Sequence, residues 1–335
     1  MFHDTLIPFA ERWIINMKEE ITVIVPVYNA EEFLLETLSS IQLQSIQDIE
    51  IVCVDDGSKD NSAKIIKEKQ REDCRIRYEY QLNQGAGVAR NRGIEISNGE
   101  FIAFMDADDS YPNVYALEKL YTAAIENKAL VCGGSAQRAD TKLDCDGKRV
   151  FRSDGYIWFE DYQFDFLFAR FIFKRCFVND YDIRFPNLRI YEDPIFLTKA
   201  LICAGKFYAI NEYVYLCSGS HQVHNMNLQK TKDYLIGVME ELKISSQYQL
   251  RDLHRIAFER LEKEASYYVE QHLYSGDVKL LSLLLNANSA IDKNLIGLNQ
   301  DYVLPPIISL WNAGNNYMKL RNLKLVQWIL HLMNK

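Results

Sequence analysis

Residues 21–62 read ITVIVPVYNAEEFLLETLSSIQLQSIQDIEIVCVDDGSKDNS, and this stretch decides the fold class. Its first five residues form a continuous apolar run rich in β-branched side chains, which is typical of a strand buried on both faces. A helical repeat of apolar residues follows over about 30–44, and residues 49–54 have the pattern of a second buried strand. A strand, a helix and a strand at this spacing predict a parallel βαβ unit.

The same alternation continues along the chain as far as residue 132. We predict further strands over 75–80, over 101–105 and from 129, and further helices up to about 69, over 83–97 and over 114–127. Together these elements predict an α/β fold with a doubly wound, mostly parallel sheet of the Rossmann-like type.

The pattern changes in the second half of the chain. The middle part is rich in Phe and Tyr and less regular, and a charged helical pattern begins near residue 226. We therefore place a soft boundary near residues 220–227. It divides an α/β domain, 1–220, with halves 21–132 and 133–220, from a helical C-terminal region, 221–335.

Composition narrows the classes of function. The 335 residues include 38 Lys and Arg and 46 Asp and Glu, which gives a net charge of −8. The chain therefore lacks the excess of basic residues that is typical of nucleic-acid-binding proteins. The seven Cys include no CxxC pair and lie mostly in apolar runs, so we expect buried free thiols in a reducing cytoplasm. We expect no signal peptide, and no apolar run reaches the roughly 20 residues of a membrane-spanning helix.

Three polar segments follow predicted strands at the point where each strand ends. They are Pro26-Val27-Tyr28-Asn29, Asp55-Asp56-Gly57-Ser58 and Asp106-Ala107-Asp108-Asp109. Ligands of open α/β sheets bind beyond the carboxyl ends of the strands, so parallel neighbours would bring all three segments to one rim.

The residue types at this rim suit a metal and a nucleotide. Asp106 and Asp108 fall on the same side by the two-residue period of a strand, and paired carboxylates suit Mg²⁺ or Mn²⁺ that also binds phosphates. Asp55 and Asp56 could accept hydrogen bonds from a ribose hydroxyl or a base N–H. The alternative for both segments is a solvated turn that caps the next helix.

The glycines do not form a dinucleotide-binding fingerprint. The segment Gln84-Gly85-Ala86-Gly87-Val88-Ala89-Arg90 has Arg90 in place of the third glycine, and it lies within a helix pattern. Its small residues favour close packing of a helix on the sheet, with Arg90 or Arg92 reaching a neighbouring acid. No P-loop, G-x-S-x-G or H-E-x-x-H motif is present.

In this order the motifs closely resemble the family 2 glycosyltransferases, which have the GT-A fold. The resemblance is continuous over about residues 21–111, and Tyr191-Glu192-Asp193-Pro194-Ile195-Phe196 resembles the acidic motif of that family's second half. It implies an enzyme that transfers a hexosyl or N-acetylhexosaminyl group with inversion from a nucleoside diphosphate sugar, usually a UDP-sugar. The half 21–132 would then bind the donor, and 133–220 would lie on the acceptor side.

The resemblance also implies roles for individual residues. Those implied in nucleotide-sugar binding are Pro26, Tyr28, Asp55, Asp56, Arg90, Asp106 and Asp109. Asp108, with Asp106, would hold the divalent metal, Mn²⁺ or Mg²⁺. Asp193 would be the general base, with Glu192 beside it. The cation that relatives carry after a Tyr-x-Tyr strand is missing here, so His221 or His224 could replace it, and an ordinary loop histidine is the alternative.

The partners follow from the same resemblance. The acceptor would be a hydroxyl of a growing surface glycan such as capsule or lipopolysaccharide, free or lipid-linked, at the inner face of the cytoplasmic membrane. Residues 316–335 have the pattern of a basic amphipathic helix with Trp328, which suits either an anionic membrane or packing on this chain or a second subunit of a homodimer. Two rival functions remain, a sugar-phosphate nucleotidyltransferase and a non-catalytic nucleotide-sugar-binding module.

Overall fold

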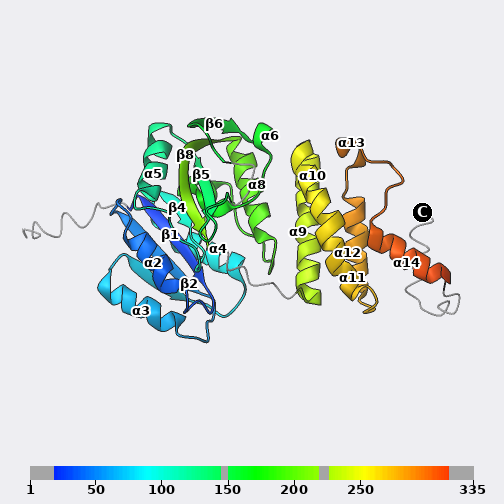
Figure 1. Cartoon of the computed structure of the whole chain (residues 1–335), viewed down its shortest axis with the longest axis horizontal. Helices are drawn as coiled ribbons and strands as arrows, with labels where there is room; N and C mark the ends of the chain where they lie inside the picture. The colour runs from blue at the N-terminus through cyan, green and yellow to red at the C-terminus, as the bar shows by residue number, and fades with distance from the viewer. Residues whose placement is uncertain (1–18, 145–149, 219–225, 317–335) are drawn as a thin grey trace, which may run out of the picture. The chain divides into compact units, whose positions relative to one another are not determined.

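A computed structural model describes residues 19–144, 150–218 and 226–316 of the chain (Figure 1). The chain divides into two compact units. The first takes the described residues within Met1–Tyr162, Phe166–Asn187 and Phe196–Gln222, and the second takes those within Gln163–Asp165, Leu188–Ile195 and Val223–Lys335. None of the described helices is both long and apolar enough to span a bilayer.

The first unit is built on an eight-stranded sheet with the order β3-β2-β1-β4-β7-β5-β8-β6. The strands are β1 (Ile21–Val27), β2 (Ile49–Asp55), β3 (Ile76–Tyr80), β4 (Phe101–Phe104), β5 (Val131–Arg138), β6 (Gly155–Trp158), β7 (Phe171–Lys174) and β8 (Lys206–Cys217). β1 and β2 are buried along their whole length, as their mostly apolar, β-branched sequences predict. The predicted α/β fold with a mostly parallel sheet is therefore confirmed.

The sheet contains two antiparallel strands, β7 and β6, among its parallel ones. β1, β2, β3 and β4 pair in parallel, but β7 lies between β4 and β5 and is antiparallel to both. β5 and β8 pair in parallel, and β6 closes the edge antiparallel to β8. The first unit therefore has a mixed sheet, in which the aromatic middle of the chain supplies the inserted strand.

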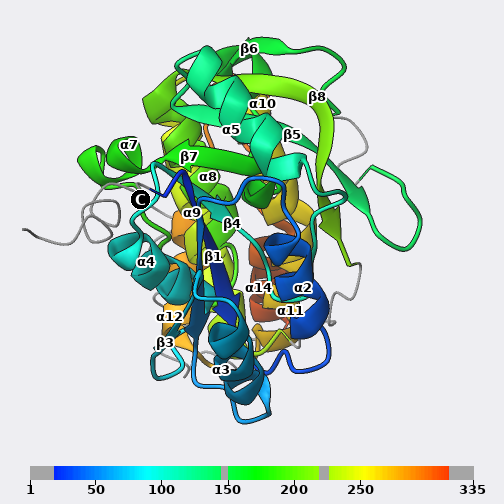
Figure 2. The same cartoon turned by 90° about the vertical axis from the view of Figure 1, so that its left-hand side faces the viewer.

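Helices cover both faces of the sheet. They are α2 (Leu34–Gln42), α3 (Ser62–Glu72), α4 (Ala86–Ile96) and α5 (Ala116–Glu126). Crossovers between parallel strands are right-handed, and the step from β3 to β4 runs back across the sheet, so α4 must lie on the face opposite to α2. Figure 2 shows α2 and α4 on opposite sides of β1. Gly93 permits this packing, because a Cβ there would lie 2.3 Å from Ile24 Cγ2.

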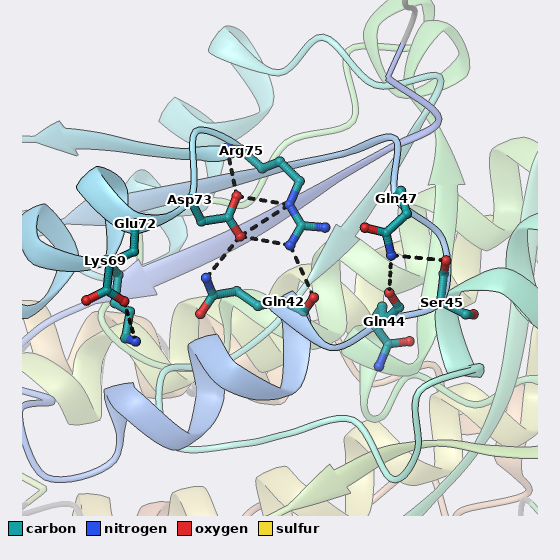
Figure 3. Close-up of polar contacts among 8 residues, drawn as sticks. All are labelled: Gln42, Gln44, Ser45, Gln47, Lys69, Glu72, Asp73 and Arg75. Atoms are coloured by element: carbon teal, nitrogen blue, oxygen red, sulfur yellow. Dashed lines mark hydrogen bonds and ion pairs between the residues drawn. The ribbon is translucent and has the colours of Figure 1, made fainter.

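Polar side chains close the turns that precede the strands. The Arg75 guanidinium pairs with Asp73 at 2.8 Å and donates to the Gln42 carbonyl at 3.1 Å, while Gln42 Nε2 donates to Asp73 (Figure 3). Arg75 holds the pKa of the Asp73 carboxyl well below its ordinary value, although burial opposes this. These contacts join the end of α2 to the turn between α3 and β3, at the edge of the sheet opposite to the acidic segments.

The second unit is helical. Its described helices are α9 (Leu228–Gln247), α10 (Arg251–Arg260), a π-helical turn (Leu261–Ala265), α11 (Ser266–His272), α12 (Val278–Ser289), α13 (Lys293–Ile296) and α14 (Pro305–Asn316). Asn227, Asp277 and Asp292 cap α9, α12 and α13 by accepting a backbone N–H of the first turn. Leu235, Leu242, Leu261 and Val269 are fully buried in its apolar core.

Candidate active site

The carboxyl ends of β1, β2 and β4 lie side by side in the first unit. Val27 at the end of β1 pairs with Asp55 at the end of β2, and β4 leads directly into the acidic segment at Asp106. The chain proceeds from β1 outward to β3 and then returns to β4 on the other side of β1. The strand order therefore reverses here, which is where ligands bind in open α/β sheets.

Tyr28 lies exposed at this rim, whereas Pro26 is buried in the sheet. Tyr28 keeps 49% of its surface accessible, so its ring is available for a ligand. The pairing of β1 with β4 ends at Ile24, and Pro26 faces the β4 side two residues further on. Because no β4 residue is paired with Pro26, its missing N–H removes no hydrogen bond between the strands. The two loops are joined where Asn29 N donates to Ser58 Oγ at 3.0 Å and Lys59 N donates to Asn29 Oδ1 at 2.8 Å.

Asp55 and Asp56 are buried, and both carboxylates accept hydrogen bonds from within the first unit. Asp55 accepts from the Ser58 N–H at 2.8 Å and from the Tyr78 hydroxyl at 2.9 Å. Asp56 accepts from Gln81 Nε2 at 2.7 Å and from the N–H groups of Gln84 and Gly85 at 2.8 Å. Both residues thus help to hold the loops at the rim in place. The oxygens of Asp56 retain acceptor capacity for a ligand, because a carboxylate can accept about four hydrogen bonds.

Arg90 in α4 lies buried behind Asp106. Its guanidinium donates to Asp106 Oδ1 at 2.8 Å and lies 4.8 Å from the centre of the Phe168 ring and 5.3 Å from that of Phe185. The side chain of Arg90 is only 5% exposed, against 35% for Asp106. Arg90 therefore orients Asp106 from within the unit, and Asp106 is the member of the pair that reaches the rim.

β8 supports the acidic segment from the other side. The Tyr215 hydroxyl donates to Asp109 Oδ2 at 2.7 Å and accepts from the Asp106 N–H at 3.2 Å. The Ser218 N–H donates to Asp109 Oδ1 at 2.7 Å, and Ser218 Oγ donates to Asp108 at 3.2 Å. A small cavity of about 240 Å³ lies at this place, and it is lined by Phe33, Glu36, Thr37, Asp108, Asp109, Ser110, Ala139 and Ser218.

Asp109 is the carboxylate of this segment whose surroundings favour its protonated form. Burial, and then the charge of Asp106, raise the pKa of the Asp109 carboxyl to about 7, although hydrogen bonds from Ser218 and Tyr215 oppose the shift. Crowded carboxylate oxygens are the donors that Mg²⁺ and Mn²⁺ prefer. In the part of the chain that the structure describes, no group of three or more His, Cys, Asp and Glu side chains is placed to hold a metal ion. Asp106, Asp108 and Asp109 could therefore supply only part of the shell of a divalent cation, and water or ligand oxygens would have to complete it.

A larger cavity, of about 470 Å³, lies at the opposite edge of the sheet, where Glu50, Arg75, Arg77 and Asn98 line it. Glu50 accepts from the Thr22 hydroxyl at 2.7 Å and from Asn98, and it also pairs with Arg77. Because Glu50 is engaged by these neighbours and the cavity is far from the carboxyl ends of the strands, the smaller cavity is the better candidate for an active site.

The second acidic motif begins a helix. α8 (Glu192–Ala204) starts directly after Tyr191, with Glu192 buried and Asp193 half-buried in its first turn. Acidic residues are favourable there, because the helix dipole places partial positive charge at the N-terminus. Pro194 follows at the third position of the helix. Residues 189–195 belong to the second unit.

Some predicted residues lie outside the described parts of the chain, and some residues of the site were not predicted from the sequence. His221, His224 and the helix predicted over 316–335 lie outside the described residues, except for the end of α14 at Asn316. Tyr215 and Ser218 were not predicted as partners of the acidic segment. The Tyr-x-Tyr pattern could have pointed to Tyr215, but the hydrogen bond joins residues 106 positions apart, which no local pattern reveals.

The sequence of this chain is similar to those of known glycosyltransferases. A family model described as glycosyl transferase family 2 matches residues 22–183. GlyG, a glycosyltransferase of Streptococcus pneumoniae, is 32% identical over 219 residues, which cover 60% of this chain and 71% of GlyG. EpsH of Bacillus subtilis is 34% identical over 190 residues, which cover 54% of this chain and 55% of EpsH, so the match spans about half the length of that relative.

A solved structure extends the likeness over most of the chain. TarS 1-349 of S. aureus in complex with UDP-GlcNAc has a TM-score of 0.62 and 20% sequence identity, and the match covers 94% of this chain and 91% of that one. At this level of identity the likeness shows a shared fold, including its helical C-terminal part.

Proposed function

This chain belongs to glycosyl transferase family 2, and from that premise we propose that it is an inverting glycosyltransferase. It moves a sugar from a UDP-sugar to an acceptor hydroxyl of a growing surface glycan, with a divalent metal and an aspartate base. The observation that carries the proposal is the cluster of Asp106, Asp108 and Asp109 where the strand order reverses, supported by Arg90 and Tyr215.

The donor site would lie on the rim of the first unit. The exposed ring of Tyr28 would stack on the uracil, and the remaining acceptor capacity of Asp56 would bind a base N–H. Asp106, held by Arg90, would face the ribose, and Asp109 would lie next to the sugar. Pro26 and Asp55 would act through the shape of the loops, because both are buried in the described structure.

The reaction makes one glycosidic bond and breaks one bond to phosphate. The acceptor hydroxyl attacks the anomeric carbon, its proton passes to Asp193, and UDP leaves from the opposite face, so that the configuration inverts. Glu192 lies beside the base in the same helical turn. Asp108, with Asp106, would hold Mg²⁺ or Mn²⁺, which when bound supplies charge stabilisation for the leaving diphosphate.

The same proposal extends to the donor sugar and the acceptor. The structure of TarS with UDP-GlcNAc makes UDP-GlcNAc the first donor to test, and UDP-glucose and UDP-galactose follow. The acceptor would be a glycan or lipid-linked glycan of the capsule or lipopolysaccharide type, reached from the cytoplasmic side. Peripheral contact with the membrane or a homodimer would be provided by the helical C-terminal region.

The experiment is a thermal-shift screen of the full chain with nucleoside diphosphates and their sugars, with and without Mn²⁺. A ligand that binds only the native state stabilises it by about 2.7 kcal/mol at 100 times its Kd. We expect UDP and one UDP-sugar to raise Tm only when Mn²⁺ is present. Asp108→Asn should abolish this shift, and Asp48→Asn, at an exposed position before β2, should keep it.

Each outcome has a distinct meaning for the proposal. A shift with another nucleotide but not with uridine ligands would retain the glycosyltransferase and overturn the donor. A shift that persists in Asp108→Asn would overturn the metal role of that residue. Binding of a UDP-sugar without UDP release, even with acceptor glycans of a cell extract, would favour the non-catalytic binding module.

A further inference from the structure

The backbone is unusual at the residue that precedes the proposed base. Tyr191 has φ +71°, in the left-handed region that bulky residues rarely adopt. Such a conformation persists only where its surroundings enforce it. Because Tyr191 immediately precedes Glu192 and Asp193, its backbone sets the direction from which the chain enters α8 and so the place of both carboxylates.

A buried polar cluster of the second unit holds the Tyr191 side chain. The cluster consists of Tyr191, Asp165, Glu241 and Arg260, and we call it the Arg260 cluster. The Tyr191 hydroxyl donates to Glu241 and accepts from Arg260 Nη1 at 2.9 Å. Arg260 also binds both oxygens of Asp165, with Nη2 and Oδ1 3.0 Å apart. Its guanidinium lies 5.5 Å from the centre of the Tyr191 ring.

The charges of the Arg260 cluster balance. The carboxylates of Asp165 and Glu241 are fully buried, and a single guanidinium lies against both. Burial, and then the charge of Asp165, raise the pKa of the Glu241 carboxyl well above its ordinary value. Burial would also raise the pKa of Asp165, but the charge of Arg260 and the hydrogen bonds from Glu241 and Arg260 together outweigh it and lower that pKa. With a proton on Glu241 donated to Asp165, the cluster would carry one negative and one positive charge, and each of its four side chains would have a partner.

Neighbouring residues restrict the Tyr191 ring to one position. Gly237 of α9 lies against it, and a Cβ at that position would be 2.7 Å from Tyr191 Cδ1. The Tyr234 ring meets it edge to face, with ring centres 5.0 Å apart. Directly after Arg260 the helix passes into the π-helical turn Leu261–Ala265, a local irregularity that is frequent at functional sites.

We propose that Tyr191, clamped by Arg260 and Glu241, is a positioning residue that fixes Glu192 and Asp193 for base catalysis. The inference rests on the proposed function, because Tyr191 would affect the reaction by placing Asp193, the proposed base. Tyr191 itself is buried, and its hydroxyl is engaged by Glu241 and Arg260, so it acts on the base through the backbone. Its loss should therefore lower kcat and leave donor binding unchanged.

The test compares two hydroxyl deletions in the same core of the full chain. Tyr191→Phe removes the bonds to Glu241 and Arg260, and the control Tyr234→Phe removes a 2.7 Å bond to Glu264. The assay is UDP release from UDP-GlcNAc, or from whichever UDP-sugar raises Tm, with water as the acceptor. We expect Tyr191→Phe to lower kcat at least tenfold with KM within twofold. Tyr234→Phe should change both constants less than twofold.

Equal kcat values for the two variants would overturn the inference. If Tyr191→Phe does not fold, Gly237→Ala replaces it, because the added methyl group displaces the same ring while the hydroxyl is kept. A tenfold lower kcat with unchanged KM in that variant supports the inference, and a wild-type kcat overturns it.

Failure of the proposed function can be recognised separately. If Asp193→Asn releases UDP as fast as the wild type, or if the wild type releases none, the proposed base role falls. The positioning role is then decided by amide hydrogen exchange of the segment 188–195. Faster exchange in Tyr191→Phe than in Tyr234→Phe supports the clamp, and equal exchange overturns it.

Discussion

Tyr215 donates its hydroxyl hydrogen to Asp109 Oδ2 at 2.7 Å, across 106 positions of the chain. The same hydroxyl accepts the Asp106 N–H at 3.2 Å, so one side chain of β8 supports both ends of the acidic segment after β4. Tyr215 is fully buried, and burial, then the charges of Asp106 and Asp109, raise its pKa well above the ordinary value. The phenol therefore stays protonated and remains a hydrogen-bond donor to the carboxylate.

Removal of this hydroxyl should weaken both the fold and the donor site. Tyr215→Phe leaves Asp109 without one of its two donors, and a buried group that loses its partner costs about 1–3 kcal/mol. We expect a loss of this size in urea unfolding and a smaller Tm shift with UDP and Mn²⁺.

Tyr213→Phe is the matched control, because its hydroxyl bonds Asp144 at 2.6 Å from the same strand but away from the acidic segment. It should retain the full shift with UDP. An equal loss of UDP binding in both variants would show that Tyr215 contributes only to the stability of β8.

Two arginines of α4 provide a second comparison. Arg90 is 5% exposed and pairs with Asp106, whereas Arg92 is 42% exposed and pairs with Glu79 at 2.7 Å. Breaking a buried pair costs about 3–5 kcal/mol, and the partial exposure of Asp106 reduces our expectation for Arg90→Met to about 2–4 kcal/mol. Arg92→Met should cost at most about 1 kcal/mol. Urea unfolding of both variants checks this, and equal costs would contradict the buried role of Arg90.

The parts of the molecule that the sequence predicts are those encoded by local patterns. The mostly apolar, β-branched sequences of β1 and β2 predict buried parallel strands, and the acids after β4 follow from the strand end itself. β7 was not predicted, because its four residues Phe171–Lys174 have no pattern that distinguishes them from the surrounding aromatic segment. Its place between β4 and β5 depends on pairing with distant strands.

The site was predicted in the same uneven way. Asp106, Asp108 and Asp109 share one short segment, so their proximity is a local property. The hydrogen bonds that hold Asp55 and Asp56, and those of the Arg260 cluster, join residues that are 3 to 95 positions apart in the sequence. Most of these residues are distant from each other in the sequence. Sequence periodicity carries no information about such contacts. Tyr191 shows the same limit, because its left-handed backbone is enforced by residues of α9 and α10.

Thiol reactivity should separate the cysteines by burial. Of the described cysteines, Cys53, Cys132 and Cys217 are buried, while Cys74, Cys176 and Cys203 are exposed, so the expectation of mostly buried thiols holds for half of them. Burial raises the pKa of the Cys53 thiol to about 12 and, with Asp154, that of Cys132 to about 12. Only the thiolate reacts, so both should be inert at pH 8.

The measurement is labelling of the native chain by an aromatic disulfide reagent at pH 8, in a Cys145→Ser background. We expect rapid labelling of Cys74 and Cys176, slower labelling of Cys203, whose pKa burial raises, and labelling of the buried three only in denaturant. Rapid labelling of native Cys53 would mean that β2 opens far more readily than its burial between β1 and β3 indicates.

The raised pKa of Glu241 predicts how stability depends on pH. Glu241 binds its proton more tightly in the folded chain than in the unfolded chain, where its pKa is near 4.5, so it stabilises the fold fully below that pH. This contribution is lost as pH rises, by up to about 1.4 kcal/mol per pH unit, until the folded pKa is passed. Asp165 has a lowered pKa, so its contribution is lost only on acidification and does not change between pH 5 and 8.

Glu241→Gln tests this sign, because glutamine is always neutral and can donate to Asp165 while it accepts from Tyr191. We expect the variant to become steadily more stable relative to the wild type as urea unfolding is repeated from pH 5 to pH 8. The control Glu264→Gln removes the exposed carboxylate that binds Tyr234 in the same unit, and it should follow the wild-type profile. A constant difference between Glu241→Gln and the wild type across this range would mean that Glu241 is ionised in the fold. Arg260 would then face two negative charges, and the neutral Arg260 cluster proposed to hold Tyr191 would be wrong.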